Sequence, residues 1–462
     1  MNVITRCRRY LFRHPKTLVT ITASQSSLAK FENHPYDLHR IDSPPVLVEV
    51  TKEDAIDIFT KMVMIRRMEN AAAQLYQRKL ILGFCHLYAG QEACAVGVNT
   101  IMRPGDNVIT TYRCHAWAYL MGVELESIYG ELLGKVTGSS RGKGGSMHLY
   151  GDNLYGGNGI VGAHIPLGTG LALAHKYKND GGICFTVFGD GAMDQGQTHE
   201  AFNFAKLHNL PVIYILENNN YSMGTPSVRH AANTELYKRG DLIPGIRLDG
   251  MDVFATREAT KFAVEYVKSE KGPILLEFAT YRYFGHSMSD PGTTYRTREE
   301  IQAIRERRDC IKLLTEKLVK TEVATEEELK KIDKESSVIV EKAIQEAMKE
   351  KEPDSNELTF DIYKESKERF NLLGSHRDGN SQHRDPGRNI IAKPGPTRFP
   401  CEVAVFPGNR RKSPVRMFDG CLLELDSSRE TGREAKRLRN SSCRAFSSET
   451  VQTVVSSFLF VT

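Results

Sequence analysis

Two apolar stretches of the chain each end in side chains that suit a metal ion. The first, residues 183–188, leads to Asp190 between two glycines, and the second, Val212–Leu216, leads to Asn218–Asn220. Asp190 and Asn219 are 29 residues apart, the length of a crossover between parallel strands. A carboxylate, an amide oxygen, a backbone carbonyl and phosphate oxygens make a good magnesium shell. The spacing therefore predicts a site for Mg²⁺ and a phosphate group.

A βαβ unit would position these side chains. Residues 195–208 have a helical pattern and connect the two apolar stretches. Open α/β sheets bind ligands at the carboxyl ends of their strands, where Asp190 and Asn219 would lie. Gly189 and Gly191 would let the backbone approach a diphosphate closely. The simpler alternative is a turn at Asp190 with asparagines that cap loops; the combination at this spacing favours the metal site.

Further motifs accompany this unit. They are GFCHL (83–87), TTYR (110–113), GKGGSMH (142–148), GGNGIVGA (156–163), TYRYFGHSMSDPG (280–292) and YRTREE (295–300). With the Asp190 and Asn219 segments, they closely resemble the α subunit family of the pyruvate dehydrogenase first component, over about residues 31–370. The resemblance implies an α/β thiamine diphosphate-binding fold, with a mostly parallel sheet, helices on both faces and additional C-terminal helices.

The resemblance also implies an activity and a set of site residues. The activity is thiamine diphosphate- and magnesium-dependent decarboxylation of pyruvate, with transfer of the acetyl group to a lipoyl arm. His86 and His286 would be the catalytic histidines. The implied cofactor-binding residues are Tyr112, Arg113, Gly151, Gly159, Val161, Asp190, Gly191, Ala192, Asn219 and Tyr221, of which Asp190, Asn219 and the Tyr221 carbonyl would bind Mg²⁺. Ser287 and Thr294 match phosphorylation sites, whereas Pro226 stands at a third such position and has no hydroxyl.

The chain lacks one part that a thiamine enzyme needs. It has a single βαβ-centred domain, whereas a second domain must place a carboxylate against the pyrimidine ring. By the resemblance, a β subunit supplies this group in an α2β2 heterotetramer. The implied further partners are the lipoyl-bearing acetyltransferase component and a regulatory kinase and phosphatase.

Three positions depart from the family pattern. Asp194, Ser222 and Phe284 replace a usual Asn, Gly and His, and Asp194 adds negative charge near a diphosphate. Two alternatives to the pyruvate enzyme therefore stay open. One is the α subunit of a branched-chain 2-oxo acid dehydrogenase, and the other is a catalytically weakened, regulatory α-like paralogue.

The ends of the chain differ from its body in charge. Residues 1–30 contain six Lys or Arg and no acidic residue, which is typical of a mitochondrial transit peptide, although a retained basic arm is an alternative. Residues 371–462 have the composition of a disordered basic tail or a partner-binding arm. The net charge of the whole chain is +5. Residues 1–30 contribute +6 and residues 372–462 contribute another +6, so residues 31–371 carry −7. We therefore expect no nucleic-acid partner.

Compartment and membrane contact follow from the rest of the composition. No run of 18 apolar residues exists, so we expect no membrane span. Nine scattered cysteines without a CxxC pair suit a reducing compartment. With the transit peptide, these features predict the mitochondrial matrix.

Two glycine-rich segments partly match nucleotide-binding motifs, but we do not expect them to bind nucleotides. Gly138 to Lys143 is one residue short of a P-loop and is followed by glycine. Gly157, Gly159 and Gly162 match a dinucleotide fingerprint, but the residues before them do not have the pattern of a buried strand. We predict neither nucleotide site.

Overall fold

The computed structural model describes residues 28–359, 416–418 and 421–423. The chain divides into two units, residues 1–379 and 380–462. In the second unit, two short strands, β12 (Arg416–Phe418) and β13 (Cys421–Leu423), pair antiparallel. The predicted transit peptide (1–30) and basic tail (371–462) lie mostly outside the described residues, so they stay predictions.

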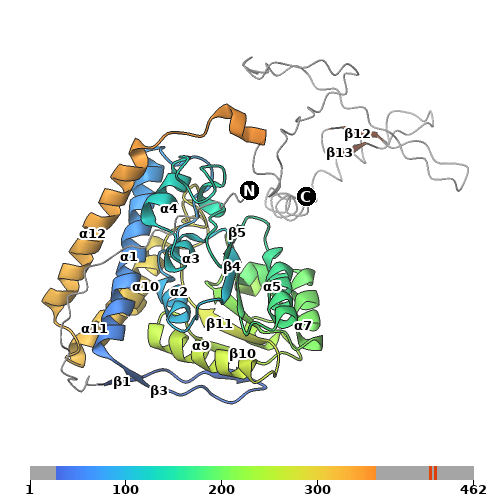
Figure 1. The fold of residues 1–462 in the computed structure, drawn as a ribbon. Coiled ribbons are helices and arrows are strands. Elements are labelled where there is room, and N and C mark those ends of the chain that lie inside the picture. The colour runs from blue at the N-terminus through green and yellow to red at the C-terminus, as the bar shows by residue number, and fades with distance from the viewer. Residues whose placement is uncertain (1–27, 360–415, 419–420, 424–462) are drawn as a thin grey trace, which may run out of the picture. The chain divides into compact units, whose positions relative to one another are not determined.

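A seven-stranded sheet forms the centre of the first unit (Figure 1). Its order is β2-β10-β11-β7-β6-β4-β5, and only the edge strand β2 runs antiparallel to its neighbour. The strands are β2 (Asp37–His39), β4 (Asn107–Thr111), β5 (Leu154–Asn158), β6 (Cys184–Gly189), β7 (Val212–Asn218), β10 (Gly245–Asp249) and β11 (Ile274–Ala279). The predicted mostly parallel sheet is confirmed.

Helices cover both faces because the central strands are apolar on both sides. In β7, Val212, Tyr214 and Leu216 pack into one buried cluster, and Ile213 and Ile215 pack into the other. The first cluster includes residues of α5 (His164–Lys178) and α7 (Gly196–Leu207), and the second includes α2 (Glu92–Asn99) and α9 (Val253–Lys268). Figure 1 shows α5 and α7 on one side of the sheet. Parallel strands buried on both faces are expected to be apolar throughout.

A layer of long helices completes the unit. Helix α1 (Lys52–Gln77) begins after Thr51, whose side chain accepts a hydrogen bond from the Asp54 amide. It packs along α12 (Glu326–Lys349), which begins with a capping box of Thr325 and Glu328. The other helices of this region are α3 (His115–Leu120), α4 (Leu125–Leu132), α10 (Arg298–Arg308) and α11 (Cys310–Lys320). Among the described residues, no helix is both long and apolar enough to cross a membrane.

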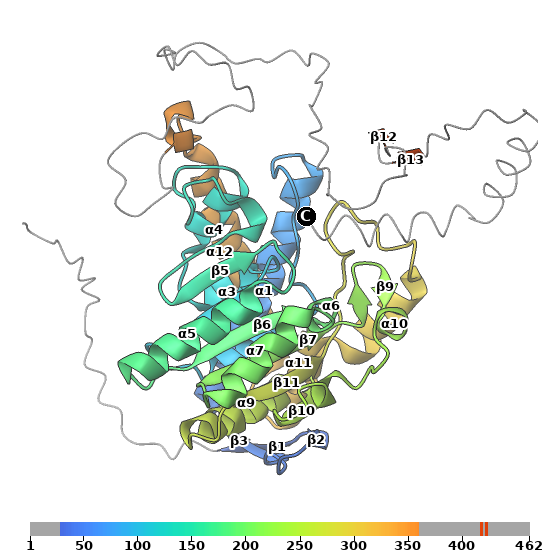
Figure 2. The same cartoon turned by 90° about the vertical axis from the view of Figure 1, so that its right-hand side faces the viewer.

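Short elements connect these layers. They are β1 (Ala29–Glu32), β3 (Leu47–Val50), α6 (Asp190–Met193), β8 (Tyr221–Ser222), β9 (Thr225–Pro226), α8 (Ser227–His230), η1 (Gly145–Met147), η2 (Leu236–Lys238) and η3 (Ser355–Thr359). Figure 2 shows α6, β9 and α10 gathered at one side of the sheet. That side holds the carboxyl ends of the parallel strands, since α6 directly follows β6.

The structure corrects one prediction about the glycine-rich region. Strand β5 leads into Gly159, and α5 begins five residues later at His164. The prediction that no strand precedes the Gly157–Gly162 motif was therefore wrong.

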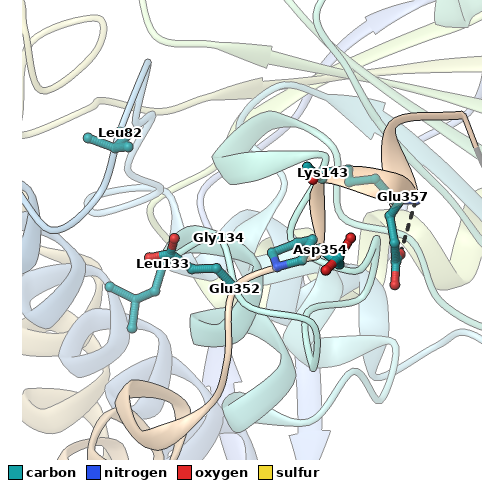
Figure 3. A pocket seen from close by; sticks show the side chains of 9 residues that line it. Leu82, Leu133, Gly134, Lys143, Glu352, Asp354 and Glu357 are labelled. Carbon is teal, nitrogen blue, oxygen red and sulfur yellow. Dashed lines mark ion pairs between the residues drawn. The ribbon is translucent and has the colours of Figure 1, made fainter. Parts of the chain in front are cut away.

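The segment resembling a P-loop has a structural role. The Glu131 carboxylate is buried and accepts four backbone hydrogen bonds, from Ser140, Gly142, Gly144 and Gly145, at 2.6–3.0 Å. The anion in this loop is thus the protein's own side chain. The end of the described first unit covers the same loop: Figure 3 shows Glu357 directed at Lys143, 3.7 Å away, and the Val136 amide donates to the Lys351 carbonyl.

Candidate active site

The predicted metal ligands lie at the carboxyl ends of adjacent strands. Gly189 of β6 pairs with Glu217 of β7, so Asp190 and Asn219 emerge side by side at this edge. Both side chains are buried. The end of β11 pairs with the end of β7 and brings Thr280, whose amide donates to the Asn218 carbonyl, to the same edge. The predicted βαβ unit is therefore present, and its polar residues lie at the carboxyl ends of the strands, as expected.

Arg282, which the sequence did not indicate, links two of the predicted ligands. Its Nη1 donates to Asn219 Oδ1 at 3.1 Å and to the Tyr221 carbonyl at 3.0 Å. Its Nη2 donates to the Tyr295 hydroxyl at 2.9 Å and to the Met223 carbonyl. The two predicted metal-ligand oxygens thus converge on one cationic group. The sequence signal that could have identified Arg282 was an arginine shortly after a strand whose carboxyl end lies at the edge where ligands bind.

Asn219 is held in this orientation by a buried hydrogen-bond chain. Its Nδ2 donates to Gln91 Oε1 at 3.1 Å, and Gln91 Nε2 donates to Glu217 Oε2 at 3.1 Å. The Tyr88 hydroxyl donates to the other Glu217 oxygen. Because Nδ2 is engaged here, Oδ1 faces Arg282 and the ligand edge. Burial raises the pKa of Glu217 to about 7.

Three predicted residues from separate loops form one aromatic cluster. The His86 ring lies 4.4 Å from the Tyr112 ring and 5.1 Å from the His286 ring, between ring centres. Tyr112 and His286 are 5.4 Å apart by the same measure. His86 precedes α2, Tyr112 follows β4, and His286 follows β11. The fold therefore brings together residues up to 200 positions apart in the sequence.

The two histidines are neutral in this environment. Burial, followed by the positive charge of Arg113, lowers the pKa of His86 to about 2 and that of His286 to about 3. His86 Nδ1 is buried and has no hydrogen-bond partner within the described parts of the chain. Neutral imidazoles can accept or donate a hydrogen bond, so both rings offer hydrogen bonds rather than a fixed positive charge.

Arg113 holds the histidine loops together. Its guanidinium donates to the Leu87 carbonyl at 2.6 Å and to the His286 carbonyl at 2.9 Å, and its side chain is buried. Burial lowers its pKa. The predicted contact between Arg113 and a diphosphate stays a prediction, because these bonds show its positioning role alone.

A second network, also missed from the sequence, supports the His86 loop. His115 Nδ1 lies 2.9 Å from Glu69 Oε2, and His115 Nε2 lies 2.8 Å from Ser146 Oγ. Ser146 Oγ accepts a hydrogen bond from the His86 amide at 3.3 Å. The order of groups is that of a nucleophilic triad, but Glu69, His115 and Ser146 are all at most 2% exposed. The network therefore positions His86 and offers no accessible nucleophile.

The remaining predicted cofactor residues lie in two segments that flank the strand ends. Gly151, Gly159 and Val161 belong to β5 and its flanking turns, and in the described chain no hydrogen bond or ring contact joins them to the His86 cluster. Gly191 and Ala192 lie in α6 directly after Asp190. A methyl group on Gly191 would lie 2.2 Å from Ser222 Oγ, so this close approach requires glycine. Their cofactor contacts stay predictions.

The two predicted phosphorylation sites differ in accessibility. Ser287 is 5% exposed, and its Oγ lies 2.7 Å from Ser289 Oγ. Its loop is fixed by Asp290, whose Oδ2 accepts hydrogen bonds from the His286 amide at 2.7 Å and the Tyr295 hydroxyl at 2.6 Å. Thr294 is exposed.

The residues at this edge fit a cation with a phosphate group. Asp190, Asn219 Oδ1 and the Tyr221 carbonyl are the hard oxygen donors that Mg²⁺ prefers. Arg282 adds positive charge for phosphate, and its buried Nε has no partner among the described residues. The doubly covered, mostly parallel sheet with these donors at its carboxyl edge is an α/β fold of the class that binds ligands at the carboxyl ends of its strands.

Comparison with known proteins gives the family. Residues 60–356 match the family model of the dehydrogenase E1 component. The pyruvate dehydrogenase E1 component subunit alpha type II, mitochondrial, of Ascaris suum is 52% identical over 358 residues, which cover 76% of this chain and 92% of the relative. The somatic form of the mitochondrial pyruvate dehydrogenase E1 α subunit from Homo sapiens is 52% identical over 336 residues, or 72% and 86% of the two chains. The chain belongs to the dehydrogenase E1 component family, whose chemistry is thiamine diphosphate-dependent decarboxylation of 2-oxo acids.

Proposed function

We propose that the chain is the α subunit of a mitochondrial pyruvate dehydrogenase first component. It would act in the matrix, decarboxylate pyruvate and pass the acetyl group to a lipoyl arm of the acetyltransferase component. The observation that carries the proposal is the convergence of Asn219 Oδ1 and the Tyr221 carbonyl on Arg282, beside the cluster of His86, Tyr112 and His286. The similarity to relatives named for this activity supports it.

Thiamine diphosphate and Mg²⁺ would be held by the chain's own groups at this edge. Asp190, Asn219 and the Tyr221 carbonyl would bind the cation, and Arg282 would neutralise phosphate charge. Bound thiamine diphosphate supplies a nucleophilic carbon and an electron sink for decarboxylation. The predicted backbone contacts of Gly191 and Ala192 with phosphate belong to the same proposal.

His86 and His286 would handle protons and the substrate carboxylate. Both rings are neutral, so either can donate one hydrogen bond to an anionic group and accept one from another. The nearby Arg113 and Arg282 make the local field positive, which favours an anionic 2-oxo acid. The neutral rings would thus orient the substrate by hydrogen bonds, while the guanidinium groups carry the positive charge.

A β subunit would complete the site. The chain exposes large apolar side chains near the ligand edge and on α5, including Phe84 (59%), Ile160 (71%), Tyr177 (90%) and Val228 (78%). Scattered apolar residues are ordinary on a protein surface, but this many large ones suit a permanent partner. We infer an α2β2 heterotetramer in which β supplies the missing carboxylate.

Regulation by a kinase and phosphatase at Ser287 and Thr294 is part of the proposal. Ser287 directly follows His286, whose backbone is bonded to Arg113 and Asp290. A phosphate there would add about −1.5 to −2 charges beside the anion site and break the packed loop. Thr294 lies farther along the loop and is exposed, so its modification would disturb fewer of these contacts.

The test is co-expression with a β subunit and measurement of CO₂ release from labelled pyruvate and from a branched-chain 2-oxo acid. We expect release that depends on both thiamine diphosphate and Mg²⁺ and strongly prefers pyruvate. Asp190→Ala serves as the inactive control. Activity on the branched substrate alone would reject the pyruvate assignment, and an assembled heterotetramer that binds no cofactor would favour a regulatory paralogue.

A further inference from the structure

The Asp190 carboxylate has two side-chain neighbours on the side of one oxygen. Its Oδ2 accepts a hydrogen bond from Ser227 Oγ at 3.3 Å, and His230 Nε2 lies 3.5 Å from the same Oδ2. Oδ1 takes part in neither contact. Ser227 and His230 are the two ends of the four-residue helix α8, which packs against α6. Within the described residues, both side-chain contacts of the carboxylate are therefore on the Oδ2 side: one is the Ser227 hydrogen bond, and the other is the close approach of His230 Nε2, which has no hydrogen-bond partner there.

His230 is itself fixed from behind. Its Nδ1 is bonded to Asp194 Oδ2, and Asp194 Oδ1 is bonded to Arg239 Nη1. The ring is nearly buried, since its side chain is 12% exposed, so it has little freedom to rotate away. Asp194 was expected to add free negative charge near the diphosphate. Both of its oxygens are instead engaged, one with a cation and one with an imidazole.

We propose that His230, anchored by Asp194 and Arg239, is a positioning residue that together with Ser227 fixes Asp190 Oδ2 and leaves Oδ1 directed to the cation. This inference rests on the proposed function, in which Asp190 is a magnesium ligand. Partners behind a metal ligand set its orientation, and their loss typically costs 10- to 100-fold in metal affinity. Asp194 is thus part of the site's support.

The partners of the two His230 ring nitrogens distinguish a positioning role from direct binding of the metal ion. Nδ1 is occupied by Asp194, and Nε2 is the only ring nitrogen that faces Asp190. His230 acts on Oδ2, whereas the cation would bind Oδ1. The proposal therefore requires that no nitrogen of His230 enters the inner coordination shell.

The experiment measures the Mg²⁺ dissociation constant of the heterotetramer at saturating thiamine diphosphate by calorimetry. His230→Ala should raise this constant about 10- to 100-fold. His230→Gln, whose amide can reach the position of Nε2, should restore most of the affinity. His208→Ala, at an exposed histidine at the end of α7, is the matched control and should change nothing.

A second variant and a spectroscopic readout keep the outcome clear if His230→Ala folds poorly. Asp194→Asn preserves shape while weakening the anchor, so it should raise the constant less than His230→Ala does. With Mn²⁺ in place of Mg²⁺, electron spin-echo spectra should show no directly coordinated nitrogen from His230. A constant within twofold of the parent in both variants, or a His230-dependent inner-shell nitrogen, overturns the inference.

Asp190→Ala separates this failure from failure of the proposed function. If Asp190→Ala abolishes Mg²⁺ binding while His230→Ala and Asp194→Asn do not alter it, the metal site stands and the positioning role is wrong. If Asp190→Ala leaves Mg²⁺ affinity unchanged, the metal assignment itself is wrong.

Discussion

Two segments of this chain share a high glycine content but differ in how their polar groups are used. Residues 138–145 direct four backbone amides at the buried Glu131 carboxylate, so their hydrogen-bonding capacity is consumed inside the protein. The segment around Asp190 presents a carboxylate at the strand ends, beside Asn219 and Arg282, where buried polar atoms have no partner among the residues that the structure describes. Glycine density alone therefore does not indicate a ligand site. What distinguishes the two segments is whether another part of the chain already satisfies the polar groups.

Removal of the Asp190 carboxylate is the most severe test of this difference between the two segments. Asp190→Ala should lower Mg²⁺-dependent cofactor affinity by at least about 100-fold, because little else could offset the diphosphate charge. The fold should be retained, and near-ultraviolet circular dichroism of the heterotetramer would check it. Glu200→Ala, at an exposed position of α7 in the same βαβ unit, should leave affinity unchanged. Unchanged affinity in Asp190→Ala would place the metal elsewhere.

Phosphorylation tests the same edge by adding charge to it. Kinase treatment of the heterotetramer should abolish nearly all activity through Ser287, with weaker or absent control through Thr294 and none at Pro226. Since Ser287 is 5% exposed, its loop must open before the kinase can act, so modification should be slower than at exposed Thr294. Ser287→Ala is the control. If that enzyme is inhibited as fully as the parent, the regulatory switch lies elsewhere.

Glu131 tests the opposite region. Glu131→Gln keeps the shape but turns one acceptor oxygen into a donor, which leaves two buried amides without partners. The free energy of unfolding should fall by about 3 kcal/mol, while the Mg²⁺ dissociation constant stays the same. Urea unfolding at fixed protein concentration measures the first quantity. Glu126→Gln, exposed on the same helix α4, should cost less than about 0.5 kcal/mol. If Glu131→Gln also weakened cofactor binding, the proposed difference in use between the two segments would be wrong.

Local patterns predicted much of this molecule. The βαβ unit around Asp190 follows from the apolar and helical patterns of its segments, the mostly parallel sheet was implied by the resemblance, and the structure confirms both. His86, Tyr112 and His286 were identified by resemblance, and the structure brings them together. The functions of these three residues stay predictions.

Partners that are distant in sequence could not be predicted. Arg282 bonds to Asn219 and Tyr221 across 63 and 61 positions, so no window of sequence contains both ends of these contacts. The same holds for His230 and Asp190. The strand β5 was missed for a different reason: it is a glycine-rich edge strand, and glycine removes the apolar alternation by which strands are recognised.

The smallest effect that we predict is that of acid on the unfolding free energy. Acid would act through His164, which lies at the sheet edge near Asp190. This buried histidine donates from Nε2 to the Val187 carbonyl of β6 at 2.7 Å, and burial lowers its pKa to about 4. A histidine whose folded pKa is depressed stabilises the fold fully above its unfolded pKa of about 6.5 and progressively less as the pH falls toward 4. Between pH 7 and 5.5, His164 should therefore cost about 1 kcal/mol of unfolding free energy. His164→Gln retains a donor without a proton to bind, so its unfolding free energy should lose about 1 kcal/mol less over this range, whereas His208→Gln should follow the parent. An equal pH dependence in His164→Gln and the parent would show that acid acts through other groups.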